Sequence, residues 1–118
     1  MAVNVLITDD SAVMREILRE IVQDRFTVIA EAEDGEGAVR AVMECPVDVV
    51  LMDMVMPNVG GIEATSVIKE INPDLPVVFC TSVDQQDRMR DAIDAGADGY
   101  IMKPFEEETI IEAIDDVI

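Results

Sequence analysis

The chain has 118 residues, half of them hydrophobic, which predicts one folded domain over residues 1–118 and argues against a disordered chain. Its 26 acidic and 8 basic residues give a net charge of −18, which argues against nucleic acid and anionic membranes as partners, because both attract positive charge. The sequence contains no histidine, so catalysis by histidine and metal binding by histidine are excluded.

The first half of the chain alternates predicted strands with predicted helices. Apolar runs predict strands at residues 3–7 and 26–30. Apolar residues recur at helical spacing after Ser11, the expected N-cap of a first helix, and again across residues 35–44. The near-continuous apolar run at residues 47–52 is typical of a parallel strand that is covered on both faces.

The second half continues the same alternation. Residues 62–71 predict a helix, which an Asn-Pro pair ends, and residues 76–80 predict the fourth strand. Residues 87–95 predict a helix with a glycine just beyond its end. A short fifth strand is predicted at residues 100–102, and apolar residues at helical spacing predict a last helix within residues 110–118.

Five strand-then-helix units predict an α/β fold with a parallel sheet and helices on both faces. Right-handed crossover connections leave few topologies for such a chain. In open sheets of this kind the functional site lies beyond the carboxyl ends of the strands. The polar residues that follow each predicted strand are therefore the candidates for a site.

Charged and hydroxyl side chains stand at four of these strand ends. Asp9 and Asp10 follow the first strand, Asp53 the third, Thr81 the fourth and Lys103 the fifth. Three carboxylates that converge on one point cannot all stay ionised without a cation, and Mg²⁺ prefers oxygen ligands of this kind. A lysine and a hydroxyl opposite them suit a phosphoryl group, so the set predicts Mg²⁺-dependent phosphoryl transfer with a carboxylate as acceptor.

Each of these residues also has a simpler interpretation when it is taken alone. An Asp-Asp pair before a helix is usually a helix cap, and a single Asp53 is usually a turn residue. Thr81 alone suits a cap, and Lys103 before a proline suits a surface turn. The coincidence of all of them at strand ends of one parallel fold favours the phosphoryl-transfer site.

The whole chain resembles the receiver domain of two-component response regulators, and most of all the single-domain chemotaxis regulators. The resemblance rests on the acid pair after the first strand, on "LMDMVMPNVGG", on "FCTS" and on "YIMKPF". It implies a flavodoxin-like fold with five parallel strands in the order 2-1-3-4-5.

The resemblance also implies the roles of the acidic residues. Asp53 would be the phosphoacceptor. Asp10 and Asp53 would bind Mg²⁺ directly together with the backbone carbonyl of Val55, and Asp9 would act through a water molecule.

Three further residues would contact the phosphoryl group or respond to it. Lys103 would contact it, and the peptide bond from Lys103 to Pro104 would be cis. Thr81 would move toward it. Tyr100 would then swing inward and reshape the face made by the fourth helix, the fifth strand and the fifth helix, as in a two-state switch that a ligand biases.

The sequence departs from the family pattern at three positions. Gly60 stands where relatives often carry an aspartate, and we expect it to alter a loop rather than the chemistry. Val55 and Val83 are apolar where many relatives carry polar residues that tune attack by water on the phosphoryl group. We therefore expect the lifetime of the phosphorylated state to differ from that of polar relatives.

For the pathway, we expect phosphorylation by a sensor histidine kinase of the chemotaxis type and docking on a motility motor or its adaptor protein. The chain would act as a monomeric switch, not as an enzyme. Two cysteines far apart and the lack of a signal-like N-terminus predict a cytoplasmic protein. Two alternatives remain: a single-domain phosphorelay carrier that passes its phosphoryl group to another histidine, and an aspartate-nucleophile phosphohydrolase of the haloacid dehalogenase type.

Acidic residues gather near the predicted last helix and suggest a basic partner surface, although a solvated helix with acids near its N-terminus explains them equally well. They are Glu106, Glu107, Glu108, Glu112, Asp115 and Asp116.

Overall fold

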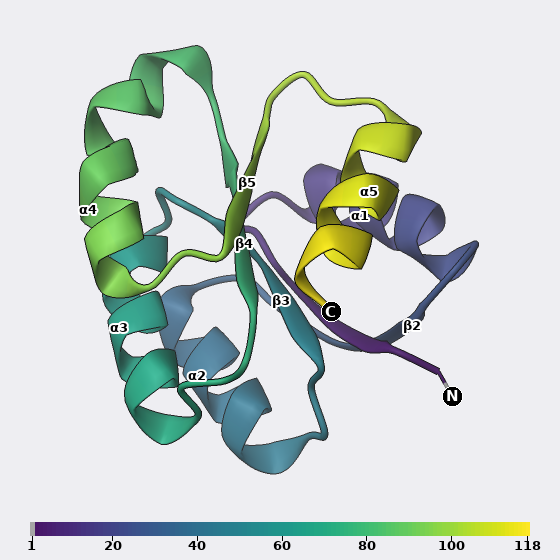
Figure 1. Cartoon of the computed structure of the whole chain (residues 1–118), viewed down its shortest axis with the longest axis horizontal. Coiled ribbons are helices and arrows are strands. Elements are labelled where there is room, and N and C mark those ends of the chain that lie inside the picture. The colour runs from purple at the N-terminus through teal and green to yellow at the C-terminus, as the bar shows by residue number, and fades with distance from the viewer. Residues whose placement is uncertain (1) are drawn as a thin grey trace.

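The computed structural model describes residues 2–118, except for the side chains of Val83 and Asp84. Within these residues five parallel strands alternate with helices, as the sequence predicts (Figure 1). The strands lie in the order β2-β1-β3-β4-β5. The predicted flavodoxin-like order is therefore confirmed, and the winding reverses between β1 and β3.

The strands are β1 (Asn4–Thr8), β2 (Thr27–Ala32), β3 (Val49–Asp53), β4 (Val77–Thr81) and β5 (Gly99–Met102). The helices are α1 (Ala12–Gln23), α2 (Gly35–Glu44), α3 (Gly61–Ile71), α4 (Met89–Ala95) and α5 (Glu107–Val117). A 3₁₀ helix, η1 (Val83–Arg88), precedes α4.

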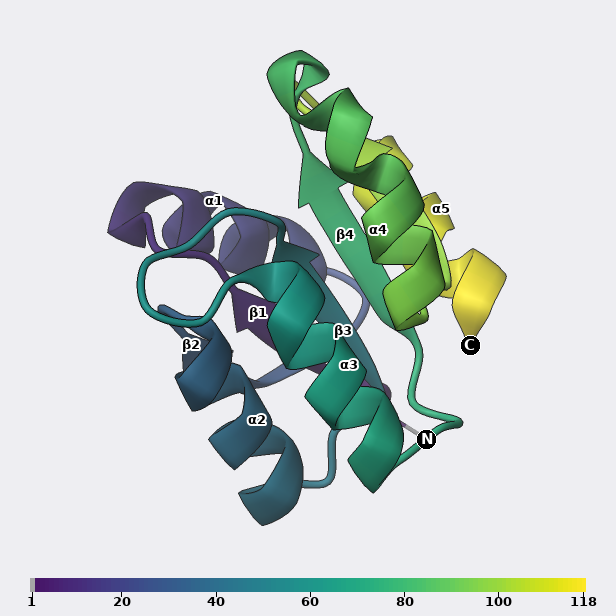
Figure 2. The same ribbon diagram turned by 90° about the vertical axis from the view of Figure 1, so that its left-hand side faces the viewer.

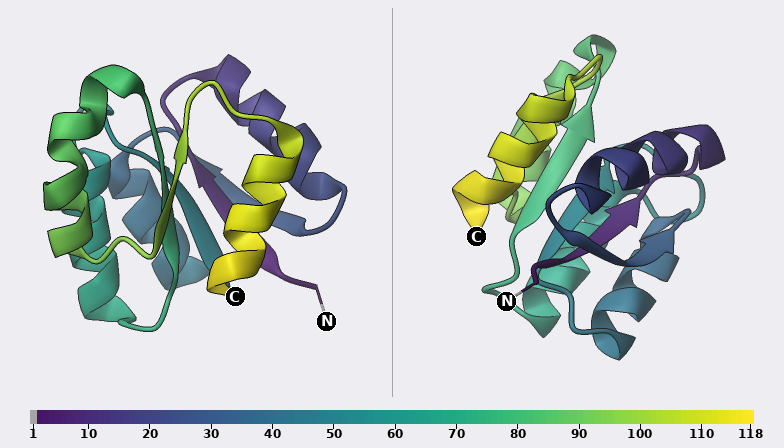
Figure 3. Two further views of the ribbon diagram at one scale, coloured as in Figure 1. Left: turned by 45° about the horizontal axis from the view of Figure 1, so that its top comes forward. Right: turned by 90° about the vertical axis from the view of Figure 1, so that its right-hand side faces the viewer.

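The sheet is covered by two helical layers. Figure 2 shows α2, α3 and α4 on one face, and the right-hand view of Figure 3 shows α1 and α5 on the other. Side chains alternate between the layers along β3, where Val50 and Met52 pack with α2, α3 and α4, and Val49 and Leu51 pack with α1 and α5. Every residue of β3 and β4 is buried, which explains why their sequences are almost continuously apolar.

Four predicted bounds differ from the structure by two or three residues. β3 begins at Val49 rather than at residue 47, and the last helix begins at Glu107 rather than at residue 110. The second strand was predicted at residues 26–30 but continues to Ala32, because Glu31 and Ala32 still pair with the end of β1. Glu31 hides this extension in the sequence, since a charged side chain is tolerated on an edge strand. The helix predicted at residues 87–95 begins at Met89, because η1 occupies the preceding residues.

Candidate functional site

The polar residues predicted to form a site do meet at the carboxyl edge of the sheet. Asp53 and Thr81 are the last residues of β3 and β4. The Lys103 amide, just after β5, donates to the Thr81 carbonyl oxygen at 2.6 Å, which ties the ends of β4 and β5 together. The loops that leave β4 and β5 rise together at the top of Figure 1.

Three carboxylates lie together at this edge. Oxygen atoms of Asp9, Asp10 and Asp53 lie within 4.8 Å of one another, and across the described residues this is the one group of three acids close enough to hold a metal ion. Asp9 is 2% exposed and Asp53 is 5% exposed, whereas Asp10 faces solvent. Two of the charges are therefore removed from water, which disfavours their ionised forms.

Lys103 supplies positive charge to the two buried acids. Its Nζ lies 3.4 Å from Oδ1 of Asp53 and 3.7 Å from Oδ2 of Asp9. Burial, followed by the charge of Asp9, raises the pKa of Asp53 to about 6, although Lys103 opposes the shift. Burial also raises the pKa of Asp9 above its ordinary value. Burial acts to lower the pKa of Lys103, but Asp53 and Asp9 outweigh it and raise that pKa.

The donor set fits a hard divalent cation. Oδ2 of Asp9 is buried and makes no hydrogen bond within the described part of the chain, since the Lys103 ammonium group lies 3.7 Å away, beyond hydrogen-bond distance. A single lysine cannot neutralise three carboxylates. Oxygen ligands with an open, partly solvated side suit Mg²⁺, which keeps several of its waters. The acid cluster that the resemblance implies is present, and its chemistry agrees with the predicted Mg²⁺.

Local hydrogen bonds fix the acid pair at the start of α1. Oδ1 of Asp9 accepts a hydrogen bond from the Ser11 amide at 2.9 Å, and Oγ of Ser11 accepts one from the Met14 amide at 3.2 Å. The prediction that Ser11 caps this helix is confirmed. Arg15 donates from Nη1 to the Asp9 carbonyl oxygen at 2.7 Å. Nothing in the sequence pattern indicated this role of Arg15, because it depends on where the chain turns.

Close packing by the start of α3 and by β4 fixes the position of Asp53. A Cβ on Gly61 would lie 2.1 Å from the Asp53 carbonyl oxygen, so only glycine lets α3 begin this close to the end of β3. Cys80 pairs in register with Asp53, and its complete burial raises the pKa of its thiol to about 12. The Cys80 side chain is thus a neutral apolar wall of the site.

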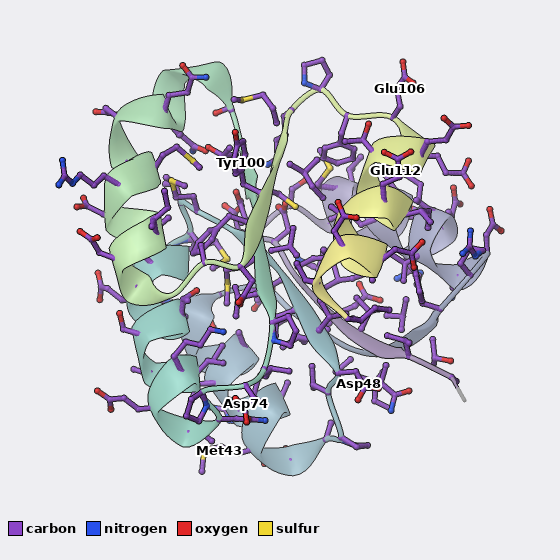
Figure 4. All side chains as sticks on the ribbon, viewed as in Figure 1. Met43, Asp48, Asp74, Tyr100, Glu106 and Glu112 are labelled. Carbon is purple, nitrogen blue, oxygen red and sulfur yellow. The ribbon has the colours of Figure 1, made fainter. Side chains whose placement is uncertain are left out.

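Thr81 and Tyr100 lie on neighbouring strands with opposite exposure, and Tyr100 pairs in register with Phe79, two residues before Thr81. Thr81 is fully buried, and its hydroxyl lies 3.4 Å from Oε1 of Gln85 and 3.4 Å from the Ser82 carbonyl oxygen. Tyr100 is 58% exposed, and Figure 4 shows it between β5 and α4. Gln85 was not among the predicted site residues, although the Ser-x-x-Gln pattern that begins at Ser82 is a recognised capping signal at the start of a helix.

The structure also describes the cis bond that the resemblance implied and two of the three positions that depart from the family pattern. The peptide bond between Lys103 and Pro104 is cis, as the resemblance implied. Gly60 is the N-cap of α3 and provides no side-chain cap. The Val55 side chain is 45% exposed beside Asp53, and the side chain of Val83 lies outside the described residues.

Comparisons with known proteins agree with this geometry. Residues 5–115 match the family described as the response regulator receiver domain. The chain is 48% identical to the chemotaxis protein CheY of Halobacterium salinarum, over 100% of this chain and 98% of that protein. It resembles the structure of Vibrio cholerae chemotaxis protein CheY4 with a TM-score of 0.92 and 25% identity, over 100% of both chains. It also resembles a CheX-CheY-BeF3-Mg complex from Borrelia burgdorferi, with a TM-score of 0.90, 30% identity, and 98% and 88% coverage.

The chain therefore belongs to the response regulator receiver family. Within that family it is most similar to chemotaxis proteins of the CheY type, as the sequence motifs suggested. Receiver domains of this kind are signalling switches rather than enzymes that turn over a substrate. None of the helices in residues 2–118 has the length and apolar character that a membrane crossing requires.

Proposed function

We propose that the chain is a single-domain response regulator whose Asp53 accepts a phosphoryl group. One observation carries the proposal: Asp53 is buried at the end of β3, within an acid cluster and 3.4 Å from the Lys103 ammonium group. A carboxylate so placed is held between a cation site on one side and a fixed positive charge on the other. This combination serves phosphoryl transfer, which needs positioning and charge neutralisation above all.

Asp10, Asp53 and the Val55 carbonyl oxygen would bind Mg²⁺ directly, and Asp9 would bind it through a water molecule. Asp10 would then be the carboxylate ligand on the solvent side, and Asp53 the buried one. Bound Mg²⁺ would supply positive charge to the phosphoryl oxygens. The unsatisfied Oδ2 of Asp9 would gain a water partner in that arrangement.

In the transfer step a carboxylate oxygen of Asp53 attacks phosphorus. The new P–O bond forms as the P–N bond to the donor histidine of the kinase breaks, and the electron pair of that bond stays on the histidine nitrogen. In the structure the Lys103 ammonium group lies near Asp53 and Asp9. During the transfer it would turn toward a phosphoryl oxygen. The product is an aspartyl phosphate, which water later hydrolyses.

Thr81 and Tyr100 would carry the switch to the surface. The Thr81 hydroxyl is now directed to Gln85 and Ser82 through contacts of 3.4 Å, which are long and therefore weak. A phosphoryl oxygen on Asp53 would offer it a charged and stronger acceptor. Movement of Thr81 would leave room for Tyr100, which starts from its exposed position, to swing inward.

The α4-β5-α5 face would be the output surface. Ile93 of α4 is 61% exposed and Tyr100 of β5 is 58% exposed, so two of the elements of this face each present an apolar or aromatic side chain to solvent. A change in the Tyr100 position would alter this face directly. Binding by the switched form alone then follows from differential affinity for two states.

The partners we propose come from the similarity to chemotaxis proteins. A sensor histidine kinase of the chemotaxis type would phosphorylate the chain, and a motility motor or its adaptor would bind the phosphorylated form. The relative from Borrelia burgdorferi is in a complex with CheX, BeF3 and Mg, which supports protein contact as the output mode. We propose a cytoplasmic monomer that binds no nucleic acid.

The phosphorelay carrier remains the second candidate, since it would use the same Asp53 chemistry with a different docking surface. Transfer of the phosphoryl group from Asp53 to a histidine of a second protein would favour it. The phosphohydrolase reading has less support, because that class carries an Asp-x-Asp nucleophile motif and here Met54-Val55 follow Asp53.

The acidic end of α5 would meet a basic partner patch. Asp24, Arg25 and α5 residues from Glu107 to Asp115 line a hollow of about 520 Å³. Figure 4 shows Glu106 and Glu112 on this part of the molecule. Reversing the charges of Glu107 and Glu108 should weaken docking on the motor-side partner. Unchanged affinity would contradict the proposal.

The experiment for the central proposal uses acetyl phosphate as a small phosphodonor. Incubation with Mg²⁺ should add the mass of one phosphoryl group to the intact protein, and Asp53→Asn should abolish the adduct. An adduct that survives the substitution would remove Asp53 from its role. Phosphorylated protein coupled to a pull-down from the source organism would then identify the partner.

A further inference from the structure

The turn between β2 and α2 contacts both loops that carry the proposed metal ligands. The Asp9 amide donates to the Ala32 carbonyl oxygen at 3.0 Å, which ties the acid pair to the end of β2. The Gly35 amide donates to the Val59 carbonyl oxygen at 2.9 Å, which ties the β3–α3 loop to the start of α2. Residues 32–35, which include none of the proposed ligands, therefore support the site from one side.

Asp34 makes two separate contacts from this turn. Its Oδ1 accepts the Gly37 amide at 2.8 Å and so caps α2, and its Oδ2 accepts the side-chain amide of Asn58 at 3.3 Å. Both hydrogen bonds favour the ionised form, and they lower the pKa of Asp34. One carboxylate thus joins the start of a helix to the loop that carries Val55.

Asn58 holds a backbone conformation that needs support. Its φ is 65°, in the left-handed region, where asparagine is tolerated better than most residues. It lies three positions beyond Val55 and one before Val59, so its side-chain bond and the Gly35–Val59 bond fix adjacent residues. The loop is then fixed on both sides of Val55, because the Met54 carbonyl oxygen accepts the Gly61 amide at 3.0 Å.

Packing closes the contact between the turn and the loop. A Cβ on Gly35 would lie 2.5 Å from the Val59 carbonyl oxygen and 2.7 Å from its Cγ1. The two backbones therefore touch with no space for a side chain, and Val59 cannot drift without breaking its hydrogen bond. The same contact lets Asp34 reach Asn58.

We propose that Asp34 and Asn58 are positioning residues for the metal site: the hydrogen bond between them restricts the β3–α3 loop and preorganises the Val55 carbonyl for Mg²⁺. This inference rests on the proposed function, in which that carbonyl is a ligand. The general basis is that groups behind the direct ligands tune metal affinity by fixing their orientation.

The test measures the dissociation constant of Mg²⁺ by isothermal titration calorimetry, without any phosphodonor. Asn58→Gly keeps the left-handed backbone and removes the side chain, and Asp34→Ser keeps a capping oxygen for the Gly37 amide but cannot reach Asn58. Each should weaken Mg²⁺ binding by about 3- to 10-fold, the value of one ordinary hydrogen bond. The double variant should bind no more weakly than the weaker single variant, because both changes break the same bond.

Two control variants separate positioning from charge, and the wild-type measurement separates this inference from the proposed function. Glu33→Gln removes a neighbouring negative charge and should change Mg²⁺ affinity far less than Asp34→Ser does. Asp34→Asn should keep near-wild-type affinity. The oxygen of its side-chain amide still accepts the Gly37 amide, and its NH₂ group can donate to the side-chain oxygen of a rotated Asn58. Unchanged affinity in Asn58→Gly, or additive losses in the double variant, would overturn the inference alone. A wild-type chain that binds no Mg²⁺ would overturn the proposed function as well.

Discussion

Replacing Asp53 by asparagine should stabilise the metal-free protein at neutral pH, although it removes the proposed phosphoacceptor. In the folded chain, burial and the charge of Asp9 raise the pKa of Asp53 from 3.8 to about 6. Each pKa unit corresponds to about 1.4 kcal/mol, so the ionised carboxylate costs the folded state about 3 kcal/mol. Asparagine has the same shape and no charge to bury, so the variant should recover up to this amount.

The sign of the pH dependence follows from proton binding. Between pH 3.8 and about 6 the folded state holds the Asp53 proton while the unfolded state has released it. The free energy of unfolding of the wild-type chain therefore falls, through this group, as pH rises across that window. The advantage of Asp53→Asn should be small below the window and reach its full size above it.

Urea unfolding, followed by far-ultraviolet circular dichroism in the presence of a chelator, measures this difference at a pH below the window and at one above it. Asp94→Asn is a matched control, because it removes one negative charge from the exposed side of α4. Added Mg²⁺ should stabilise the wild-type chain and stabilise Asp53→Asn less, by mass action. The reasoning would be refuted if Asp53→Asn and Asp94→Asn gained equal free energy of unfolding in the chelator. It would also be refuted if Asp53→Asn were less stable than the wild-type chain above the window.

Three further predictions concern residues around Asp53. Gln85→Ala removes a hydrogen-bond acceptor from Thr81 and should raise affinity for beryllofluoride, a phosphoryl mimic, by about 2- to 5-fold in calorimetry; weaker binding would contradict the proposed switch. Gly61→Ala should lower the free energy of unfolding by about 2 to 4 kcal/mol in urea titrations, because its Cβ would overlap the carbonyl at the end of β3. Gly60→Ala, whose Cβ would lie 3.6 Å from its nearest neighbour, should cost much less, and equal losses would count against the packing argument. Val55→Asn should change the rate of phosphate release from the aspartyl phosphate, followed by phosphate assay; an identical rate would remove Val55 from control of the lifetime.

The sequence predicted the fold well where burial dominates. β3 and β4 are buried on both faces, so their composition alone marks them as central parallel strands, and the topology of such strands puts their end residues at one edge. Asp53 and Thr81 could therefore be predicted from position and chemistry. The edge strand β2 was less predictable, because Glu31 is exposed and interrupts the apolar pattern.

The supports of the site could not be predicted in the same way. The bonds from Arg15 to the Asp9 carbonyl and from Asn58 to Asp34 join residues that only the folded chain brings together. Their sequence separations have no periodicity, and surface arginine and asparagine are common without such roles. The contact of Gln85 with Thr81 is different, since the capping signal at Ser82 was present in the sequence and could have indicated it.

Tyr100 has a practical consequence that its place in the fold does not suggest at first. It is the one tyrosine of the sequence, which contains no tryptophan. Ultraviolet fluorescence of the unlabelled protein therefore comes essentially from one side chain, which lies on β5 three positions before Lys103. Emission should depend on whether that ring is in water or packed inside, so the native chain carries its own optical reporter of the proposed switch and needs no added dye.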